Sequence, residues 1–447
     1  MTLEDYLEQD AILYPSKVAV VCGNEKVTYK ELYERVLTRY LEYQGKFKQG
    51  QIITIRASQS IVFLEMYFAL HLMGCVVAPL EKNTPDSIFE QISKMLSQYE
   101  VPDGAADILY TTGTTGNAKG VIVSHRAIVA DAENLIEGLG FSHDLVFVVN
   151  GPLNHIGSLS KIYPIVLVGA TLIITDGLKD INCFYDAFDY PSSKFATFLV
   201  PASIRILIRF SAERLSKLSS KMEFVETGAA AISHDDMIKL CQLLPKSRLY
   251  NTYASTETGI ISTYNFNDGK CIVGCLGKPM KHSKIYITEN GLIACKGDTI
   301  MSGYIGDTVN TTEIMHDETI FTSDIGTIDS EGMLHLTGRM GDVINVGGFK
   351  VSPSEVEEAA LSYPGVIDCI CISVNHPITG VALKLLVVVD GDTPLNKRLL
   401  AHFLKTKLEP YKITVLYEKV ESIKRTFNGK IDRKYYINEV GESKKGE

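Results

Sequence analysis

The sequence predicts an α/β protein with a large N-terminal domain and a small α+β domain at the C-terminus. In the first half of the chain, short β-branched segments alternate with helical patterns, an order typical of a largely parallel sheet between layers of helices. From about residue 269 the pattern changes to short strands and Gly-rich turns, which predicts a β-rich subdomain. After Gly348 helices and strands return, enough for a further domain of roughly 100 residues.

Each expected element follows from its own local pattern. In the first layers we expect strands at 18–22, 52–55 and 75–78, the last ending at Pro79, and helices at 28–41 and 61–73. Further apolar runs of strand length lie at 145–149, 170–174, 197–200 and 224–225. In the C-terminal part we expect helices at 354–361 and 397–408, and strands at 368–374 and 382–389.

Composition excludes several classes of protein. The net charge of -9 provides no basic field for a nucleic-acid backbone, so we expect no nucleic-acid partner. The most apolar stretch, 61–80, contains Glu65 and His71, so we expect no membrane span. The acidic start MTLEDYLEQD and nine Cys without paired CxxC elements favour a reduced, cytoplasmic protein. Cys369 and Cys371 would share one face of a strand, where buried core thiols are the favoured interpretation.

Residues 110–120, YTTGTTGNAKG, have the composition of a phosphate-binding loop. Glycines allow backbone N–H groups to converge on an anion, while hydroxyls and an ammonium satisfy the remaining phosphate oxygens. The segment is not a Walker A loop, because Ala118 precedes Lys119 and Gly120 follows it. Taken alone, it is also typical of a Gly/Thr hairpin. The candidate phosphate-binding residues are Thr111, Thr112, Gly113, Thr114, Thr115, Gly116 and Lys119.

Three later segments carry further candidates. In NTYASTETG at 251–259, Glu257 is a candidate Mg²⁺ ligand beside phosphate, although a helix N-cap at Ser255 or Thr256 explains the segment equally well. Asp324 and Arg339 lie on turns that flank two strands, where an Asp turn and a surface Arg are the simpler interpretation. Lys430 follows an Asn-Gly turn and, taken alone, is a solvated charge near the C-terminus.

Taken in order, these segments resemble the superfamily of acyl-adenylate-forming enzymes, which includes acyl-CoA synthetases, firefly luciferase and the adenylation domains of nonribosomal peptide synthetases. The resemblance covers essentially the whole chain. The matching segments are 110–120 to YTSGTTGxPKG, 251–257 to NxYGxTE, 322–326 to TSDxG, 337–339 to TGR, 344–357 to the opening of the family's C-terminal domain, and 425–430 to RTxSGK.

The resemblance implies a two-step ligase that uses ATP and Mg²⁺. A carboxylate attacks the α-phosphate of ATP and expels pyrophosphate, and a thiol then attacks the acyl-adenylate and expels AMP. Residues 111–119 would enclose the β- and γ-phosphates, and Glu257 with Thr256 would serve Mg²⁺ and the α-phosphate. Tyr253 would stack on adenine.

The remaining roles implied by the resemblance involve both domains. Asp324 would bind the ribose hydroxyls with Arg339 nearby, and Lys430 would bridge the substrate carboxylate and the developing phosphate charge. The implied domains are 1–338 and a small mobile domain at 344–447, joined by a hinge at 339–343. In the second step, Gly347 and Gly348 would approach the thiol tunnel.

The segment GPLNHIG at 151–157 resembles the PLFHxxG motif of acyl- and aryl-CoA synthetases. His155 would line the acyl pocket, although a packing histidine is an equally good interpretation. Gly228 and Ala229 resemble the family's small pocket residues beside the nucleotide. Amino-acid-activating members place an Asp in this region and residues 151–161 contain none, so we expect a fatty or aryl acid without an α-amino group.

The acceptor thiol is left open between CoA and the phosphopantetheine arm of an acyl carrier protein. An acyl-AMP ligase that loads such a carrier is the alternative enzyme. A non-catalytic nucleotide or acyl sensor is a third interpretation. The presence of the five charged candidates disfavours it: Lys119, Glu257, Asp324, Arg339 and Lys430.

Overall fold

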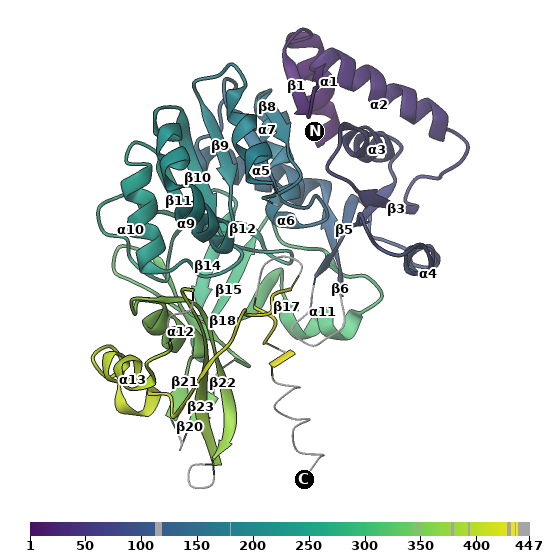
Figure 1. Ribbon diagram of the computed structural model, residues 1–447. Coiled ribbons are helices and arrows are strands. Elements are labelled where there is room, and N and C mark those ends of the chain that lie inside the picture. The colour runs from purple at the N-terminus through teal and green to yellow at the C-terminus, as the bar shows by residue number, and fades with distance from the viewer. Residues whose placement is uncertain are drawn as a thin grey trace.

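A large N-terminal domain and a smaller C-terminal domain follow one another along the chain (Figure 1). The computed structural model describes residues 1–447 except 112–118, 179, 343, 347–348, 377–379, 392–393, 427–430, 434 and 437–447. The expected α/β architecture is confirmed. The exact limits of the domains and the hinge at 339–343 stay predictions.

The main sheet of the large domain combines parallel and antiparallel strands. Its order is β14-β15-β18-β19-β13-β12-β11-β10-β9-β7-β8-β1-β2, with β17 beside β18. Strands β8, β7, β9, β10 and β11 pair in parallel, and β12 continues the sheet antiparallel into the β-rich part. The bounds are β1 Val18–Cys22, β2 Glu25–Thr28, β7 Val146–Val149, β8 Thr171–Ile174, β9 Phe195–Phe198, β10 Met222–Thr227, β11 Arg248–Ser255, β12 Gly259–Asn265, β13 Cys275–Pro279, β14 Ser283–Ile287, β15 Leu292–Gly297, β17 Met315–His316, β18 Thr319–Ile328 and β19 Leu334–Arg339.

A second sheet in the large domain has the order β16-β6-β5-β4-β3. Its strands are β3 Ile52–Ala57, β4 Val76–Glu81, β5 Ala105–Thr111, β6 Lys119–Ser124 and β16 Gly303–Tyr304. The expectation that Pro79 ends its strand is wrong, because Pro79 pairs with Ile55 inside β4. Strand β5 pairs with β4 only at Val77 and Asp107, so a residue without an N–H is tolerated further along.

Helices cover both faces of the parallel strands. Phe147, Leu172 and Phe224 point into one hydrophobic cluster with α1–α3, α5 and α7, while Val148 and Val225 point into the other with α8–α10. The bounds are α1 Leu3–Leu13, α2 Tyr29–Tyr43, α3 Ile61–Leu72, α4 Asp86–Leu96, α5 His125–Leu139, α6 Ile156–Leu159, α7 Ile162–Val168, α8 Ile181–Asp186, α9 Pro201–Lys217, α10 His234–Leu243 and α11 Thr308–Ile314, with 3₁₀ turns at Ala187–Asp189 and Leu218–Ser220.

Helix starts follow local capping chemistry. The Thr28 hydroxyl accepts from the N–H of Glu31, whose carboxylate accepts from the N–H of Thr28, so a capping box begins α2. Ser60 and Ser124 likewise cap α3 and α5 with their hydroxyls. The predicted helices at 28–41 and 61–73 are confirmed with small shifts at their ends.

The small domain has its own core. Strands β22 and β23 form a long antiparallel hairpin, β24 adds in parallel, and α12 packs on β22. The expected core thiols are confirmed, because Cys369 and Cys371 are each 1% exposed within this core. The bounds are β20 Ile344–Val346, β21 Phe349–Val351, α12 Pro353–Leu361, β22 Val366–His376, β23 Gly380–Val389, α13 Lys397–Lys405 and β24 Leu416–Lys419, with a 3₁₀ turn at Pro410–Lys412.

Charged side chains connect the two domains. Arg205 of α9 lies 3.9 Å from Asp368 of β22, and Arg209 contacts Asp390 after β23. Because these side chains are partly or largely exposed, each pair stabilises the domain arrangement by at most about 1 kcal/mol. Within the described ranges, the chain contains no helix of the length and apolarity that crossing a bilayer requires.

Candidate functional site

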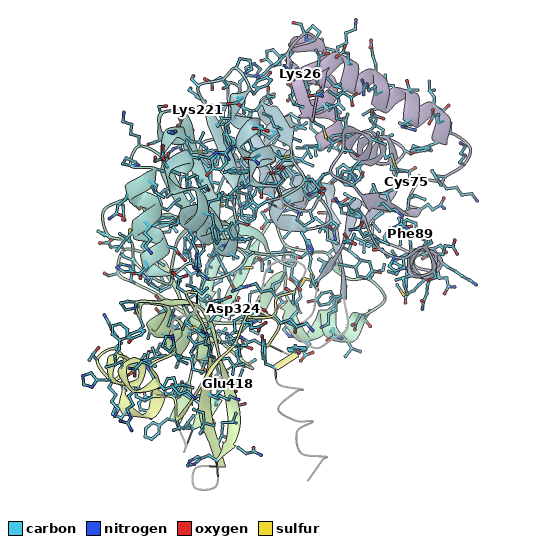
Figure 2. The ribbon with its side chains drawn as sticks, viewed as in Figure 1. Lys26, Cys75, Phe89, Lys221, Asp324 and Glu418 are labelled. Atoms are coloured by element: carbon cyan, nitrogen blue, oxygen red, sulfur yellow. The ribbon has the colours of Figure 1, made fainter. Side chains whose placement is uncertain are left out.

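Two antiparallel strands bring three of the predicted residues together. The register of β18 and β19 sets Asp324 opposite Arg339, and the two side chains approach to 3.4 Å. Tyr253 of β11 donates its hydroxyl to Asp324 Oδ2 at 2.7 Å. In Figure 2, Asp324 is labelled where the large domain meets the small one. Burial, reinforced by the Asp324 charge, raises the pKa of Tyr253, so the phenol stays protonated and donates.

Glu257 lies in the turn between β11 and β12. The alternative of a helix N-cap at Ser255 or Thr256 is wrong, because the chain makes a strand, a turn and a second strand there. The Glu257 carboxylate accepts a hydrogen bond of 2.8 Å from the hydroxyl of Tyr304. Its main-chain carbonyl accepts from the N–H of Met301 at 2.8 Å. Both the side chain and the main chain of Glu257 are therefore held by hydrogen bonds.

Lys119 begins β6, directly after the predicted phosphate loop. Its ammonium donates to Asn310 Oδ1 at 2.8 Å and lies 4.8 Å above the centre of the Tyr304 ring. Tyr304 therefore contacts both Lys119 and Glu257. Opposite Lys119, Thr111 ends β5, so β5 and β6 form the two arms of a hairpin.

Several predicted site residues fall outside the described residues. They are Thr112, Gly113, Thr114, Thr115 and Gly116 of the phosphate loop, Gly347 and Gly348 after the hinge, and Lys430. The described residues on either side of 427–430 are anchored in the small domain. Arg425 donates twice to Asp368, at 2.7 and 2.8 Å, and pairs with Ile431 through a β-bridge. Arg425 and Ile431, which flank this segment in the sequence, are thus tied to the small domain and to each other.

Two glycines of the predicted acyl-pocket segments lie close to one aromatic ring, that of Phe198. A side chain at Gly157 would reach 3.4 Å from the Phe198 ring, and one at Gly228 would come within 2.9 Å of the Thr252 carbonyl oxygen and 3.8 Å of that ring. Gly228 is buried by this close packing, and His155 directly precedes α6, the short helix that contains Gly157. The exposed Ala229 has φ +66°, a left-handed conformation that costs a non-glycine residue roughly 1–2 kcal/mol.

A buried ion pair lies directly behind this region. Lys161 donates to Glu226 Oε1 at 2.7 Å, and both side chains are 1% exposed. The Thr252 hydroxyl donates to the same carboxylate oxygen at 2.9 Å, and Lys161 lies 5.2 Å from the Phe198 ring centre. Glu226 Oε2 is buried without a hydrogen-bond partner among the described residues. A charged layer therefore supports the candidate acyl pocket.

Sequence reasoning missed Tyr304, Asn310, Phe198 and the Lys161–Glu226 pair. A detectable signal existed only for the pair. Lys161 is the single charge in the apolar run 156–168, and Glu226 lies in the mostly apolar segment 222–227, which also contains Glu223. Tyr304 and Asn310 lie 185 and 191 positions after Lys119 in the sequence, and no local pattern links them to it.

This fold and arrangement of residues define an AMP-binding enzyme, and the chain belongs to that family. The family's profile matches residues 7–101 and 89–305, and the profile of the AMP-binding enzyme C-terminal domain matches 355–430. The resemblance inferred from the sequence is thereby confirmed.

Named relatives align over nearly the whole chain. A 2-succinylbenzoate–CoA ligase of Bacillus cereus is 24% identical over 97% of this chain and 98% of its own length. Among solved structures, ATP-bound MatB from Rhodopseudomonas palustris has a TM-score of 0.86 at 20% identity, covering 98% of this chain and 99% of that one. The o-succinylbenzoate CoA synthetase MenE from Bacillus subtilis, in complex with its acyl-adenylate intermediate, has a TM-score of 0.83 at 20% identity, covering 96% and 97%.

Proposed function

We propose that this chain is an AMP-forming ligase that activates a carboxylic acid with ATP and transfers the acyl group to CoA. The observation that carries the proposal is the joint placement of two groups of side chains, one across strands β11, β18 and β19 and the other at the β11–β12 turn. Tyr253, Asp324 and Arg339 form one, and Glu257 with Lys119 forms the other around Tyr304. The CoA-ligase names of the relatives support the same activity.

In the first step an oxygen of the acid attacks the α-phosphorus of ATP, a P–O bond forms, and the bond to pyrophosphate breaks. Two anions must approach each other, so the protein contributes mainly positioning and positive charge. Lys119 and residues 111–116 would hold the β- and γ-phosphates, and binding would require Lys119 to exchange Asn310 for phosphate oxygen. Lys430 would neutralise the charge that develops between acid and α-phosphate.

Mg²⁺ suits the donors near the β11–β12 turn. Glu257 supplies a carboxylate that Tyr304 already orients, and Thr256 adds a hydroxyl in the same turn, so the set consists of hard oxygen ligands. Mg²⁺ bound there with phosphate oxygens would offset negative charge. Tyr253 would pack against adenine, and Asp324 would accept hydrogen bonds from the ribose with Arg339 beside it.

In the second step the thiol sulfur attacks the acyl carbon, a C–S bond forms, and the C–O bond to AMP breaks as the thiol gives up its proton. We propose that the small domain, 344–447, reorients about the hinge at 339–343 between the steps. Gly341 has φ +96° and open space around its Cα, so this position tolerates backbone rotation. Gly347 and Gly348 would then approach the thiol.

The acid is proposed to be an aryl acid without an α-amino group, bound between His155, Phe198, Gly228 and Ala229. The Phe198 ring provides an apolar surface against which a planar aryl group would pack. The 2-succinylbenzoate specificity in the relatives' names supports this class.

The test is release of AMP and pyrophosphate from ATP with a panel of aryl, alkyl and amino acids, each with CoA or with a phosphopantetheinylated carrier protein. We expect turnover with aryl acids and CoA, and none with α-amino acids. Transfer to the carrier but not to CoA would select the acyl-AMP ligase instead. Tight ATP binding with no pyrophosphate exchange across the panel would contradict the proposed activity.

A further inference from the structure

A second cluster of charged side chains is buried in the large domain, away from the candidate site. His71 of α3 is fully buried between two carboxylates: its Nδ1 lies 2.8 Å from Glu4 Oε1 of α1, and its Nε2 lies 3.1 Å from Asp107 Oδ1 of β5. Tyr67 donates to the other Asp107 oxygen at 2.8 Å. His125, the first residue of α5, places Nδ1 3.9 Å from Glu4 Oε2.

The charges of this cluster do not balance. Two buried carboxylates face His71, and a single proton on that imidazole leaves one of the two negative charges uncompensated while His125 is neutral. Within the described ranges, Glu4 and Asp107 form ion pairs only with histidines, and no lysine or arginine approaches them. A buried net charge is costly, so a divalent cation in place of the proton would make the cluster neutral.

The positions of the ligand atoms also suit a metal ion. One ligand atom each from Glu4, His71 and His125 lies within 4.8 Å of the others. Zinc bonds of about 2.0–2.1 Å place tetrahedral ligand atoms roughly 3.3 Å apart, so the most widely separated ligand atoms need to close by at most about 1.5 Å. The buried Nδ1 of His125 has no hydrogen-bond partner among the described residues.

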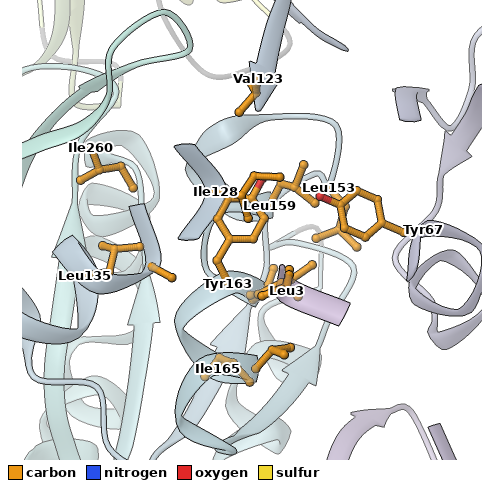
Figure 3. Packing of buried hydrophobic residues seen from close by; sticks show 14 of the residues in the cluster. Leu3, Tyr67, Val123, Ile128, Leu135, Leu153, Leu159, Tyr163, Ile165 and Ile260 are labelled. Atoms are coloured by element: carbon orange, nitrogen blue, oxygen red, sulfur yellow. The ribbon is translucent and has the colours of Figure 1, made fainter. Parts of the chain in front are cut away.

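The residues that contact His71 on its far side, Asp107 and then Tyr67, follow the pattern seen around metal-bound histidines. A ligating histidine usually donates its second ring N–H to a carboxylate, which is itself hydrogen-bonded. Here His71 Nε2 is paired with Asp107, and Tyr67 holds Asp107 in turn. Tyr67 lies with Leu3, the neighbour of Glu4, in the same buried hydrophobic cluster (Figure 3).

We propose that Glu4, His71 and His125 form a binding site for a divalent transition-metal ion of the zinc class. Two imidazoles and one carboxylate are typical zinc ligands. The site would join α1, α3 and α5 at the base of the β5–β6 hairpin, since Asp107 lies in β5 and His125 directly follows β6. It is separate from the Mg²⁺ proposed at Glu257 and supports the hairpin from the end opposite residues 112–118.

The test uses the full chain without a polyhistidine tag, stripped with chelator and kept free of nucleotide. We expect one Zn²⁺ to bind per chain in competition with a chromogenic chelator, and Co²⁺ to give the visible absorption of a tetrahedral site. Bound Zn²⁺ should raise the Tm. His125→Gln, the least buried ligand, should lose this binding, and Tyr67→Phe should weaken it about tenfold.

His282→Gln is the matched control, because His282 also lies between two carboxylates, but these are Glu133 and Asp298, which are 32% and 38% exposed. It should bind Zn²⁺ as the wild type does. Circular dichroism and pyrophosphate exchange establish that each variant is folded. Absence of stoichiometric Zn²⁺ binding by the stripped wild type would overturn the proposal, as would equal binding by His125→Gln and His282→Gln.

Discussion

The large domain buries the Lys161–Glu226 pair directly behind the candidate acyl pocket. The small domain only partly buries the pair between Arg433, 22% exposed, and Glu357, 9% exposed, beside its own β-hairpin. Arg433 donates to both Glu357 oxygens, at 2.9 and 2.7 Å, and Glu357 also accepts from the N–H of Cys371. The first pair supports residues that would bind substrate. The second lies three residues beyond Lys430, so we expect it to support the proposed catalytic step rather than binding.

This difference indicates that binding and catalysis can be separated by damaging one domain at a time. In the large domain, the described site residues are hydrogen-bonded to each other across strands and turns. In the small domain, the proposed contribution is a single lysine near the C-terminus. Among the described residues, the charged pairs Arg205–Asp368 and Arg209–Asp390 between the domains each contribute little stabilising energy.

The largest expected effect comes from truncating one partner of each pair. Glu226→Ala leaves the buried Lys161 without its carboxylate, which should lower the free energy of unfolding by about 3–5 kcal/mol. Glu357→Ala should cost less, because Arg433 is 22% exposed and keeps Asp342 at 3.6 Å. Urea denaturation measures this loss. Glu357→Ala should retain ATP binding within a few-fold while pyrophosphate exchange is lost, whereas Glu226→Ala should lose both.

The exposed Glu213, paired with Lys217, provides the control for these truncations. Glu213→Ala should change stability by less than about 1 kcal/mol. If Glu357→Ala abolishes ATP binding as completely as Glu226→Ala does, substrate binding and catalysis are not separated between the two domains.

Removing the proposed catalytic lysine is the second test. Lys430→Ala should lower acid-dependent pyrophosphate exchange by roughly 10²–10³-fold, equivalent to about 3–4 kcal/mol, because the developing phosphate charge loses its cation. ATP affinity, measured by calorimetry, should change little. Lys407→Ala, on the exposed surface of the small domain, should exchange normally, and an equally active Lys430→Ala enzyme would refute the assigned role.

The large domain should also carry a pH dependence of stability through Asp131 of α5. Burial raises the pKa of Asp131 to about 7 from the usual 3.8, although the Ile260 N–H donates to it at 2.9 Å. The folded state therefore favours the protonated acid, and stability falls as the pH rises from about 4 through 7.

Asp131→Asn, which stays neutral, should stabilise the protein by roughly 1–3 kcal/mol at pH 8 and little at pH 4. The pKa of Asp131 differs by about 3 units between the folded and unfolded states, so this stabilisation is at most about 4 kcal/mol. Urea denaturation at the two pH values measures it. An identical change in stability at both pH values would show that folding does not shift the pKa of Asp131.

The smallest effect concerns backbone strain at Ala229. Ala229→Gly should raise stability by roughly 0.5–1 kcal/mol, because relief of the left-handed conformation exceeds the added entropy of the unfolded chain. Ala230 is the control, since its φ is not positive. Thermal unfolding should show Ala230→Gly to be destabilising; a loss of stability in both variants would contradict strain at position 229.

Site residues could be predicted from the sequence where they are concentrated in short, recognisable segments. Tyr253, Asp324 and Arg339 each fall in a recognisable segment, and the structure places them within hydrogen-bond or ion-pair distance of one another. Tyr304 and Asn310 could not be found in this way, because they reach Lys119 only through the pairing of β16 with β6. Pro79 was misjudged because its tolerance depends on which side of β4 is paired.

The pairing of β16 with β6 also has a consequence for synthesis on the ribosome. Lys119 and its partner Asn310 are 191 positions apart, and at 5–20 residues per second the ribosome needs roughly 10–40 s to make the intervening chain. During that interval the outer edge of β6 is unpaired and open to wrong partners. The nascent hairpin is therefore a natural client for a chaperone that recognises an exposed strand edge until residues 303–310 emerge.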